Sequence, residues 1–114
     1  VDAFLTKAIN IVESNIDNTD FSVGDFANNL AMSKPVLYKK IQAVSGLSVN
    51  DFIKSVRLNK ARFLLLENLN NNVSEVAYMV GFSVPKYFSK EFKKKFGRSP
   101  KDWRSYGSNN LKEQ

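Results

Sequence analysis

Basic side chains are the residues of this chain with the clearest chemical capacity, and they gather in two blocks. Residues 31–62 hold seven Lys or Arg against one acid, and residues 86–104 hold eight against two, so each block carries +6. Residues 1–30 carry −4 and residues 63–85 carry −2, within a chain of 114 residues and net charge +6. Two such blocks favour an anionic partner, nucleic acid above all. The alternative is that lysine-rich faces only keep helices soluble.

The composition excludes most enzyme and metal chemistry. The chain has no Cys and no His, which removes disulfides, thiolate ligands and the usual general base near neutral pH. Neither a nucleophile–base pair nor a glycine-rich phosphate loop is present. We therefore expect no catalytic residue, no metal and no cofactor, and a chain that is not an enzyme. The chain starts without Met, which is typical of a domain cut from a longer protein, and that parent could carry kinase activity.

Helices must position the basic blocks, because strand signals are weak and helix signals run along the whole chain. Ser22, Ser48, Asn72 and Ser99 each precede an acid by three residues, the pattern of a capping box. Ser33 and Ser83 each precede a proline by two residues, so both predict an N-cap with proline in the first turn. The chain is predicted to be all-α, with seven helices over residues 3–15, 23–30, 34–45, 49–67, 73–80, 84–96 and 100–106.

The predicted helices contain an internal repeat. Positions 23–33 match positions 73–83 at an offset of 50, and positions 37–52 match positions 88–103 at an offset of 51. One extra residue therefore sits in the second turn. Each copy has the dimensions of a helix-turn-helix; a stack of helical hairpins is the alternative. The predicted organisation is an N-terminal helix with the first helix-turn-helix (1–47), a linking helix (48–67), the second helix-turn-helix with a closing helix (68–107) and a flexible tail (108–114).

The second helix of each pair carries the candidate base-reading residues. Leu37, Ile41 and Val44, and likewise Phe88, Phe92 and Phe96, form apolar stripes that are expected to be core. The opposite faces hold hydrogen-bonding or basic side chains, where a recognition helix meets base edges. Apolar residues expected to be exposed at the helix starts, Pro35, Val84 and Pro85, suit contact with a thymine methyl, although the two prolines could equally serve only to start the helices. The candidates are Lys34, Pro35, Tyr38, Lys39 and Gln42 in the first copy, and Pro85, Lys86 and Lys90 in the second.

A second group of basic residues is expected to meet phosphates and so to supply affinity without sequence information. The candidates are Lys54, Lys93, Lys94, Lys95, Arg98, Lys101 and Arg104. Other bases of the fourth helix could act in the same way. Arg57 and Arg62, however, sit among apolar residues and could equally pair with Glu67 or Glu75.

These motifs resemble the AraC/XylS transcription regulators over about residues 5–106. The resemblance is carried by the sequence VAYMVGF at 76–82, YFSKEFKKKFG at 87–97, Ser99-Pro100 and Trp103-Arg104, and by the run from Arg57 to Leu65 in the first half. LYKK at 37–40 and DFIKS at 51–55 further resemble the C-terminal output domain of hybrid two-component regulators of Bacteroidetes. The resemblance implies two helix-turn-helix units joined by a long helix, with recognition helices 34–45 and 84–96 in successive major grooves. One departure is Val84-Pro85, where the family often has small polar residues.

The expected function is sequence-specific binding of double-stranded DNA and regulation of transcription, as the output domain of a signal-responsive regulator. The alternative is a basic helical module that binds protein without intrinsic sequence specificity. RNA polymerase is an expected partner. The isolated domain is expected to be a monomer within a dimeric parent. We expect a cytoplasmic location and no membrane contact by this domain, although the parent could be anchored in the inner membrane.

Overall fold

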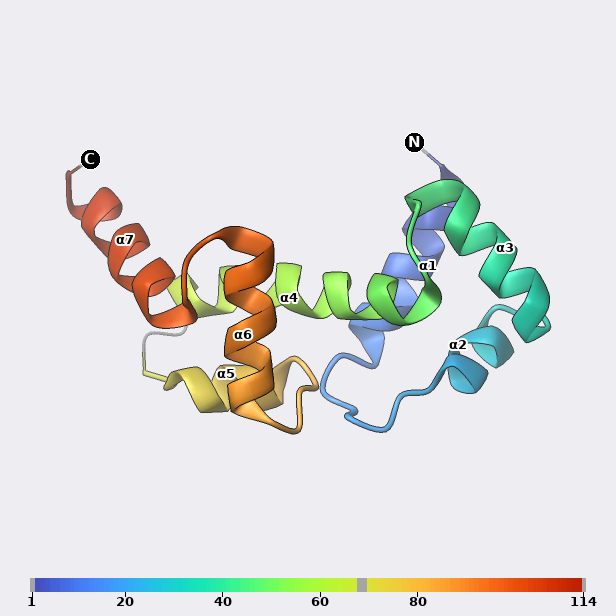
Figure 1. Cartoon of the computed structure of the whole chain (residues 1–114), viewed down its shortest axis with the longest axis horizontal. Helices are drawn as coiled ribbons and strands as arrows, with labels where there is room; N and C mark the ends of the chain where they lie inside the picture. The colour runs from blue at the N-terminus through green and yellow to red at the C-terminus, as the bar shows by residue number, and fades with distance from the viewer. Residues whose placement is uncertain (1, 68–69, 114) are drawn as a thin grey trace. The chain divides into compact units, whose positions relative to one another are not determined.

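The computed structural model (Figure 1) describes the backbone of residues 2–67 and 70–113, and the side chains of residues 2–67 and 70–107. Within these residues the chain forms seven helices and no strand. The helices are α1 (Ala3–Ser14), α2 (Val23–Asn29), α3 (Lys34–Ser45), α4 (Val49–Glu67), α5 (Val73–Met79), α6 (Pro85–Phe96) and α7 (Pro100–Glu113). The prediction of an all-α chain with seven helices is confirmed.

The chain divides into two compact units, and the boundary falls inside a helix. The first unit is Val1–Arg57 and the second is Leu58–Gln114. The first half of α4 therefore belongs to the first unit and the second half to the second unit. Each unit contains one helix pair of the repeat: α2 packs on α3, and α5 packs on α6.

The predicted caps explain where most helices begin. The Ser22 hydroxyl accepts from the Asp25 N–H at 3.0 Å, and the Asp25 carboxylate accepts from the Ser22 N–H at 3.0 Å. Asn72 and Glu75 form the same reciprocal box at the start of α5. Ser48 and Ser99 accept from the N–H of the third residue of α4 and α7, Asp51 and Asp102, each at 3.1 Å. Each bond satisfies a helix N–H that has no partner inside the helix.

The predicted cap at Ser83 is wrong. Helix α6 begins at Pro85, its N-cap is Val84, and no side chain caps it. Ser33, in contrast, caps α3 through its hydroxyl, which accepts from the Val36 N–H at 3.4 Å. The extra residue in the second turn is the reason, because it moves Ser83 one position too far from the helix and puts a valine in the place of the serine.

The first unit has an apolar core in which α1, α2, α3 and the start of α4 meet. Phe26 lies at its centre, with its ring 5.9 Å from that of Phe21 and 6.1 Å from that of Phe52. Arg57 ties the α1–α2 loop to α4, because its guanidinium donates to the carbonyls of Ile16 and Asn18 at 3.1 and 3.0 Å. Burial lowers the pKa of Arg57 from its ordinary value.

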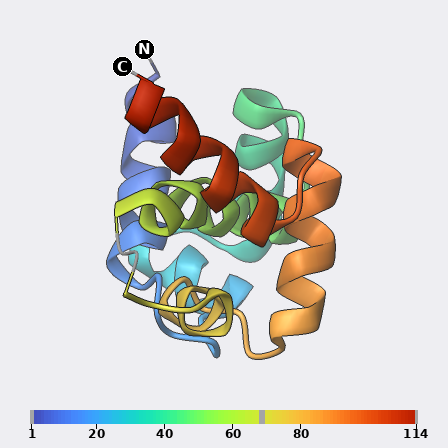
Figure 2. The ribbon, with the colours of Figure 1, turned by 90° about the vertical axis from the view of Figure 1, so that its left-hand side faces the viewer.

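A row of aromatic rings fills the second unit. Phe82, Phe88, Phe92 and Phe96 follow one another with centroids 4.7–5.7 Å apart. Trp103 of α7 closes the row: its ring lies 5.9 Å from Phe96, and its indole N–H donates to the Arg62 carbonyl at 3.0 Å. Figure 2 shows this unit from its end, with α7 nearest the viewer and crossing α4. The prediction that the Phe stripe is core is confirmed for Phe88 and Phe92, which are fully buried, whereas Phe96 is half-buried.

Helix α7 continues to Glu113, beyond its predicted end at residue 106. Glycine at position 107 suggests a helix end in a sequence, yet here it lies inside α7. A Cβ added at Gly107 would run into the side chain of Leu66. Gly107 therefore serves the close approach of α7 to the end of α4.

Candidate nucleic-acid interface

The two turns between the paired helices have the same hydrogen-bond pattern. The Met32 N–H donates to the Ala27 carbonyl at 3.0 Å, and the Phe82 N–H donates to the Ala77 carbonyl at 2.9 Å. Both turns pass through a left-handed backbone, at Ala31 with φ 54° and at Gly81 with φ 90°. Glycine adopts this conformation freely, whereas alanine is strained in it. The turns set the angle between α2 and α3 in the first unit, and between α5 and α6 in the second.

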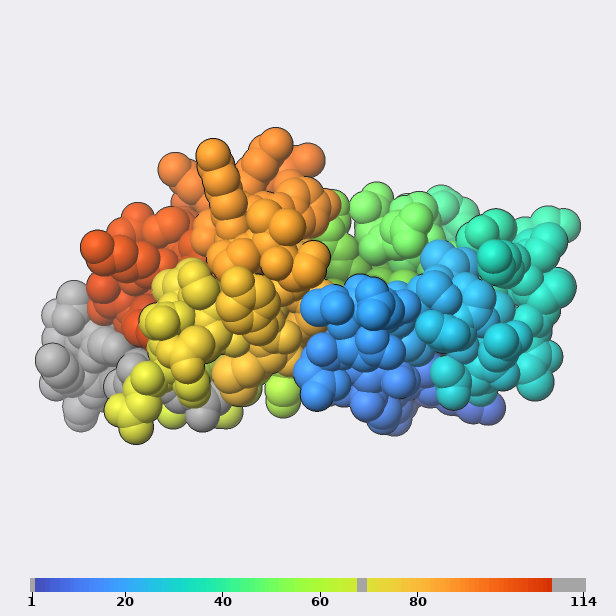
Figure 3. All heavy atoms as spheres, turned by 90° about the horizontal axis from the view of Figure 1, so that it is seen from below, coloured from blue at the N-terminus to red at the C-terminus, as the bar shows by residue number. Residues whose placement is uncertain are grey.

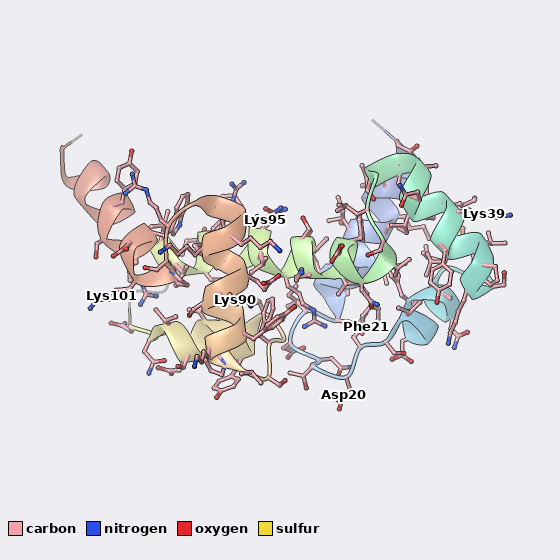
Figure 4. All side chains as sticks on the ribbon, viewed as in Figure 1. Asp20, Phe21, Lys39, Lys90, Lys95 and Lys101 are labelled. Carbon is pink, nitrogen blue, oxygen red and sulfur yellow. The ribbon has the colours of Figure 1, made fainter. Side chains whose placement is uncertain are left out.

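The outer face of α3 holds every base-reading candidate of the first copy in an exposed position. Figure 4 shows Lys39 extending from α3 into solvent. The buried residues of α3 are Leu37 and Ile41, which lie on the opposite face. The exposed candidates are Lys34, Pro35, Tyr38, Lys39 and Gln42.

The outer face of α6 presents Lys86 and Lys90, which are exposed, while Pro85 is half-buried. The spheres of α6, orange in Figure 3, stand out from the rest of the second unit. At the repeat offset of 51, Lys90 occupies the position that Lys39 occupies in α3. The two helices therefore repeat one exposed lysine at the same place.

Sequence reasoning missed two exposed apolar side chains on these faces. Val36 of α3 is 43% exposed and Tyr87 of α6 is 47% exposed, and they are equivalent at the offset of 51. The ring of Tyr87 lies 6.1 Å from that of Phe82, which holds it beside the turn. Their helical register was the available signal, since an apolar residue outside the core stripe must face solvent or a partner.

The basic candidates at the end of α6 and the start of α7 are exposed. Lys93, Lys94 and Lys95 occupy the last turn of α6. There they also face the negative end of the helix dipole, which stabilises the helix. Lys101 extends away from the ribbon of α7 (Figure 4). Arg98 is exposed, and its guanidinium lies 4.0 Å from the Tyr106 ring centroid.

Two phosphate candidates have partners inside their own units. The Nζ of Lys54 lies 3.5 Å from the Asp51 carboxylate, one turn earlier in α4. The half-buried Arg104 donates from Nε to the Leu65 carbonyl at 2.7 Å and from Nη1 to the Asn71 carbonyl at 2.6 Å. Arg104 thus ties α7 to the end of α4 and to the loop before α5, as Arg57 ties α4 to the loop before α2.

Arg62 stacks on aromatic rings. Its guanidinium lies 5.1 Å from the ring centroid of Phe63 and 5.3 Å from that of Phe96. Backbone carbonyls thus hold Arg57, and aromatic rings hold Arg62. A short stretch of sequence does not predict the contact of Arg57 with the loop before α2, or that of Arg62 with Phe96.

The described part of the chain, residues 2–67 and 70–113, holds neither a metal site nor a membrane-spanning helix. In that part, no three acidic side chains gather at a spacing that could hold a metal ion. None of the helices there combines the length and the hydropathy that crossing a membrane requires.

Comparisons with known proteins agree on one domain type. The family model described as "Helix-turn-helix domain" matches residues 26–106. Histidine kinase P4 of Formosa agariphila is 43% identical over 101 residues, which are 89% of this chain and 7% of that protein. The chain therefore spans only a small part of the length of this relative.

Solved structures share the fold. A transcriptional regulator from Chromobacterium violaceum, described among the AraC-type DNA-binding domain-containing proteins, superposes with a TM-score of 0.81 and 27% identity, covering 89% of this chain and 88% of that one. The DNA-binding domain of AdpA, solved in complex with a target DNA, superposes with a TM-score of 0.79 and 22% identity, covering 90% of each chain.

Proposed function

We infer, because this chain belongs to the AraC/XylS family of helix-turn-helix DNA-binding domains, that it binds a specific double-stranded DNA sequence and regulates transcription through that binding. The observation that carries this inference is the repeated outer face of α3 and α6. Each helix follows a turn with the same hydrogen-bond pattern, buries an apolar stripe and exposes a lysine at the equivalent position, Lys39 or Lys90. The AdpA domain of the same fold was solved on its target DNA, which supports the inference.

We propose that α3 and α6 both enter the major groove, in successive turns of one duplex. Arg and Lys donate to the O6 and N7 atoms of guanine, and Gln pairs with adenine, so these side chains suit direct readout. We assign base contacts to Lys34, Tyr38, Lys39, Gln42, Lys86 and Lys90, which are all exposed. Pro35 and Pro85 lack an N–H and begin or nearly begin their helices, so they can add only apolar contacts.

Phosphate contacts are assigned to the exposed basic residues at the end of α6 and around the start of α7. Their charges supply affinity that falls as salt rises, because binding releases counterions from the duplex. Lys54 and Arg104 are set aside, since both are half-buried and their charged groups contact oxygen atoms of their own unit. The assigned residues are Lys93, Lys94, Lys95, Arg98 and Lys101.

We propose further that the parent protein is a two-component regulator in which this chain is the output domain. Histidine kinase P4, with 43% identity, supports this proposal, because the matching segment is a small part of a longer kinase. RNA polymerase is the proposed protein partner. Dimerisation is assigned to other parts of the parent, and the cytoplasm is the proposed location, since the chromosome lies there.

Selection from a random duplex pool tests the DNA-binding proposal. The chain is incubated with the pool at low and at moderate salt, and the bound fraction is sequenced. We expect enrichment of a motif that spans roughly two helical turns and survives moderate salt. Unselective binding that disappears with salt would refute sequence-specific readout and favour the basic protein-interaction module instead.

A matched pair of variants separates residues that contact bases from residues that contact phosphates. Lys39→Ala should weaken binding by ~1–3 kcal/mol at particular base pairs and relax the preference there. Lys94→Ala should weaken binding to all sequences alike and lower the salt slope by about one. Identical behaviour of the two variants across a panel of duplexes would show that the division is wrong.

A further inference from the structure

We propose that the start of α6 reads thymine, through apolar contact of Val84 and Tyr87 with the C5-methyl group. This inference rests on the proposed binding of DNA and names the base that the second unit prefers. The ligand is a T·A pair in the major groove, where the thymine methyl is the apolar feature of the base edge.

Val84 is the first observation, because a valine at an N-cap works against the stability of its helix. Serine, threonine, aspartate and asparagine are preferred at this position, since their side chains accept from a free helix N–H. Val84 has extended backbone angles, φ −123° and ψ 103°, and α6 has no side-chain cap. Local rules are broken in this way mostly at functional sites.

The repeat supplies the matched comparison. The same position of α3 is Ser33, which makes the cap bond that α6 lacks. Helix α7 begins with Ser99 before Pro100, and Ser99 caps it. A Ser–Pro start is therefore compatible with this fold, so the proline of α6 does not require a valine before it.

The exposure of Val84 is the second, independent observation. Its side chain is 54% exposed, the largest value among the exposed large hydrophobic residues described, so its packing contributes little to the core. Val84 is the N-cap of α6 and Tyr87 is its third residue, the two positions that meet in a capping box. Together they form an apolar step at the end of the helix that would enter the groove first.

Tyr87 is held in place for such a contact. Its ring lies beside that of Phe82, which is buried and packs on Phe88 with centroids 5.2 Å apart. The ring can therefore meet a base with little loss of side-chain freedom. Lys86 and Lys90 are exposed on the same helix and suit guanine, so the half-site of α6 is expected to combine thymine with a nearby G·C pair.

Replacing thymine by deoxyuridine tests the proposal, because it removes only the methyl group. The duplex selected by the chain is synthesised with each thymine of the α6 half-site replaced singly by deoxyuridine. At one or two positions we expect affinity to fall about three- to tenfold, the effect of losing one buried methyl contact. Thymines outside the site serve as the control.

The variant Val84→Ser tests whether the Val84 side chain is what contacts the thymine methyl. This variant should unfold at a higher denaturant concentration, because serine restores the missing cap, and yet bind the thymine duplex about three- to tenfold more weakly. It should no longer distinguish thymine from deoxyuridine at one of the sensitive positions. Phe63→Ser is the matched control, since Phe63 is 52% exposed on α4 and should leave the thymine-to-deoxyuridine ratio unchanged.

The outcomes separate this proposal from the proposed function. If a motif is enriched and deoxyuridine has no effect in the α6 half-site, thymine reading is refuted while DNA binding stands. If Val84→Ser keeps the thymine preference of the unaltered chain, Val84 is not the reader. If no motif is enriched, the proposed function and this inference both fail.

Discussion

Replacing Arg104 by methionine should destabilise the second unit without changing the salt dependence of DNA binding. Methionine keeps much of the aliphatic stem but removes both donors to the Leu65 and Asn71 carbonyls. A hydrogen bond to a charged group contributes about 1.5–3 kcal/mol. Arg104 is half-buried, so water partly replaces the lost donors, and we expect the free energy of unfolding to fall by about 2–4 kcal/mol.

Urea unfolding followed by tryptophan fluorescence is the assay. Trp103 is the one tryptophan of the chain, and its indole is bonded to the Arg62 carbonyl, so the signal reports the second unit. The expected loss corresponds to a midpoint lower by about 1–2 M urea. Arg104→Lys is the control, because lysine keeps the charge but lacks the forked guanidinium donors. Its stability should lie between that of the unaltered chain and that of Arg104→Met.

The salt slope of DNA binding decides between the two roles of Arg104. If Arg104 is a structural tie, Arg104→Lys and Arg104→Met should keep the slope of the unaltered chain at temperatures where both are folded. A slope lower by about one in Arg104→Met, with unfolding unchanged, would refute the structural reasoning and return Arg104 to the phosphate contacts.

Three further predictions concern the turns, a cap and the indole. Ala31→Gly should raise the free energy of unfolding by about 0.5–1 kcal/mol, and Gly81→Ala should lower it by about 1–2 kcal/mol, because only glycine adopts positive φ without strain; thermal unfolding of both variants measures this. The Glu75 pKa is lowered, chiefly because its carboxylate accepts from the Asn72 N–H. Its contribution to stability should be full above the ordinary pKa of about 4.3 and be lost as the pH falls through the lowered value, so the stability gap between the unaltered chain and Glu75→Gln should close in acid; a gap that stays constant from pH 7 to pH 2 would contradict this. Trp103→Phe should cost about 1–2 kcal/mol through the lost indole bond, as measured by circular dichroism in urea.

Local chemistry explains why so much of the fold could be predicted. The capping boxes at Ser22 and Asn72 use residues three apart, and the buried stripes of α3 and α6 follow the helix period, so both are visible in any short window. The predicted cap at Ser83 was wrong because the position of a cap depends on the turn before it, and one inserted residue shifts that position. The length of α7 was missed for a related reason, since Gly107 is accounted for only by its contact with Leu66.

The candidate site was harder to predict wherever its residues act over long sequence separations. Arg57 and Arg104 bond carbonyls 33–41 residues away, and a basic residue in a sequence gives no sign of such a partner. Lysines on the outer faces of α3 and α6 were predictable, because they follow from the helix period. Val36 and Tyr87 were overlooked, although their helical register places them outside the apolar stripes of α3 and α6.

The position of the unit boundary within α4 bears on how such domains can exchange parts in evolution. Val49, Phe52 and Val56 are buried in the first unit, while Leu58, Ala61 and Leu65 of the same helix are buried in the second. A crossover in the loop before α4 would pair one parent's α3 with another parent's Val49–Val56 surface. A crossover after α4 would pair one parent's Leu58–Leu65 surface with another parent's α5, α6 and α7. Recombination in the α2–α3 or α5–α6 turn instead replaces a recognition helix together with everything after it. A crossover between Arg57 and Leu58 would instead keep the buried partners of each unit together, so lineages of this domain should exchange whole units there rather than at a loop.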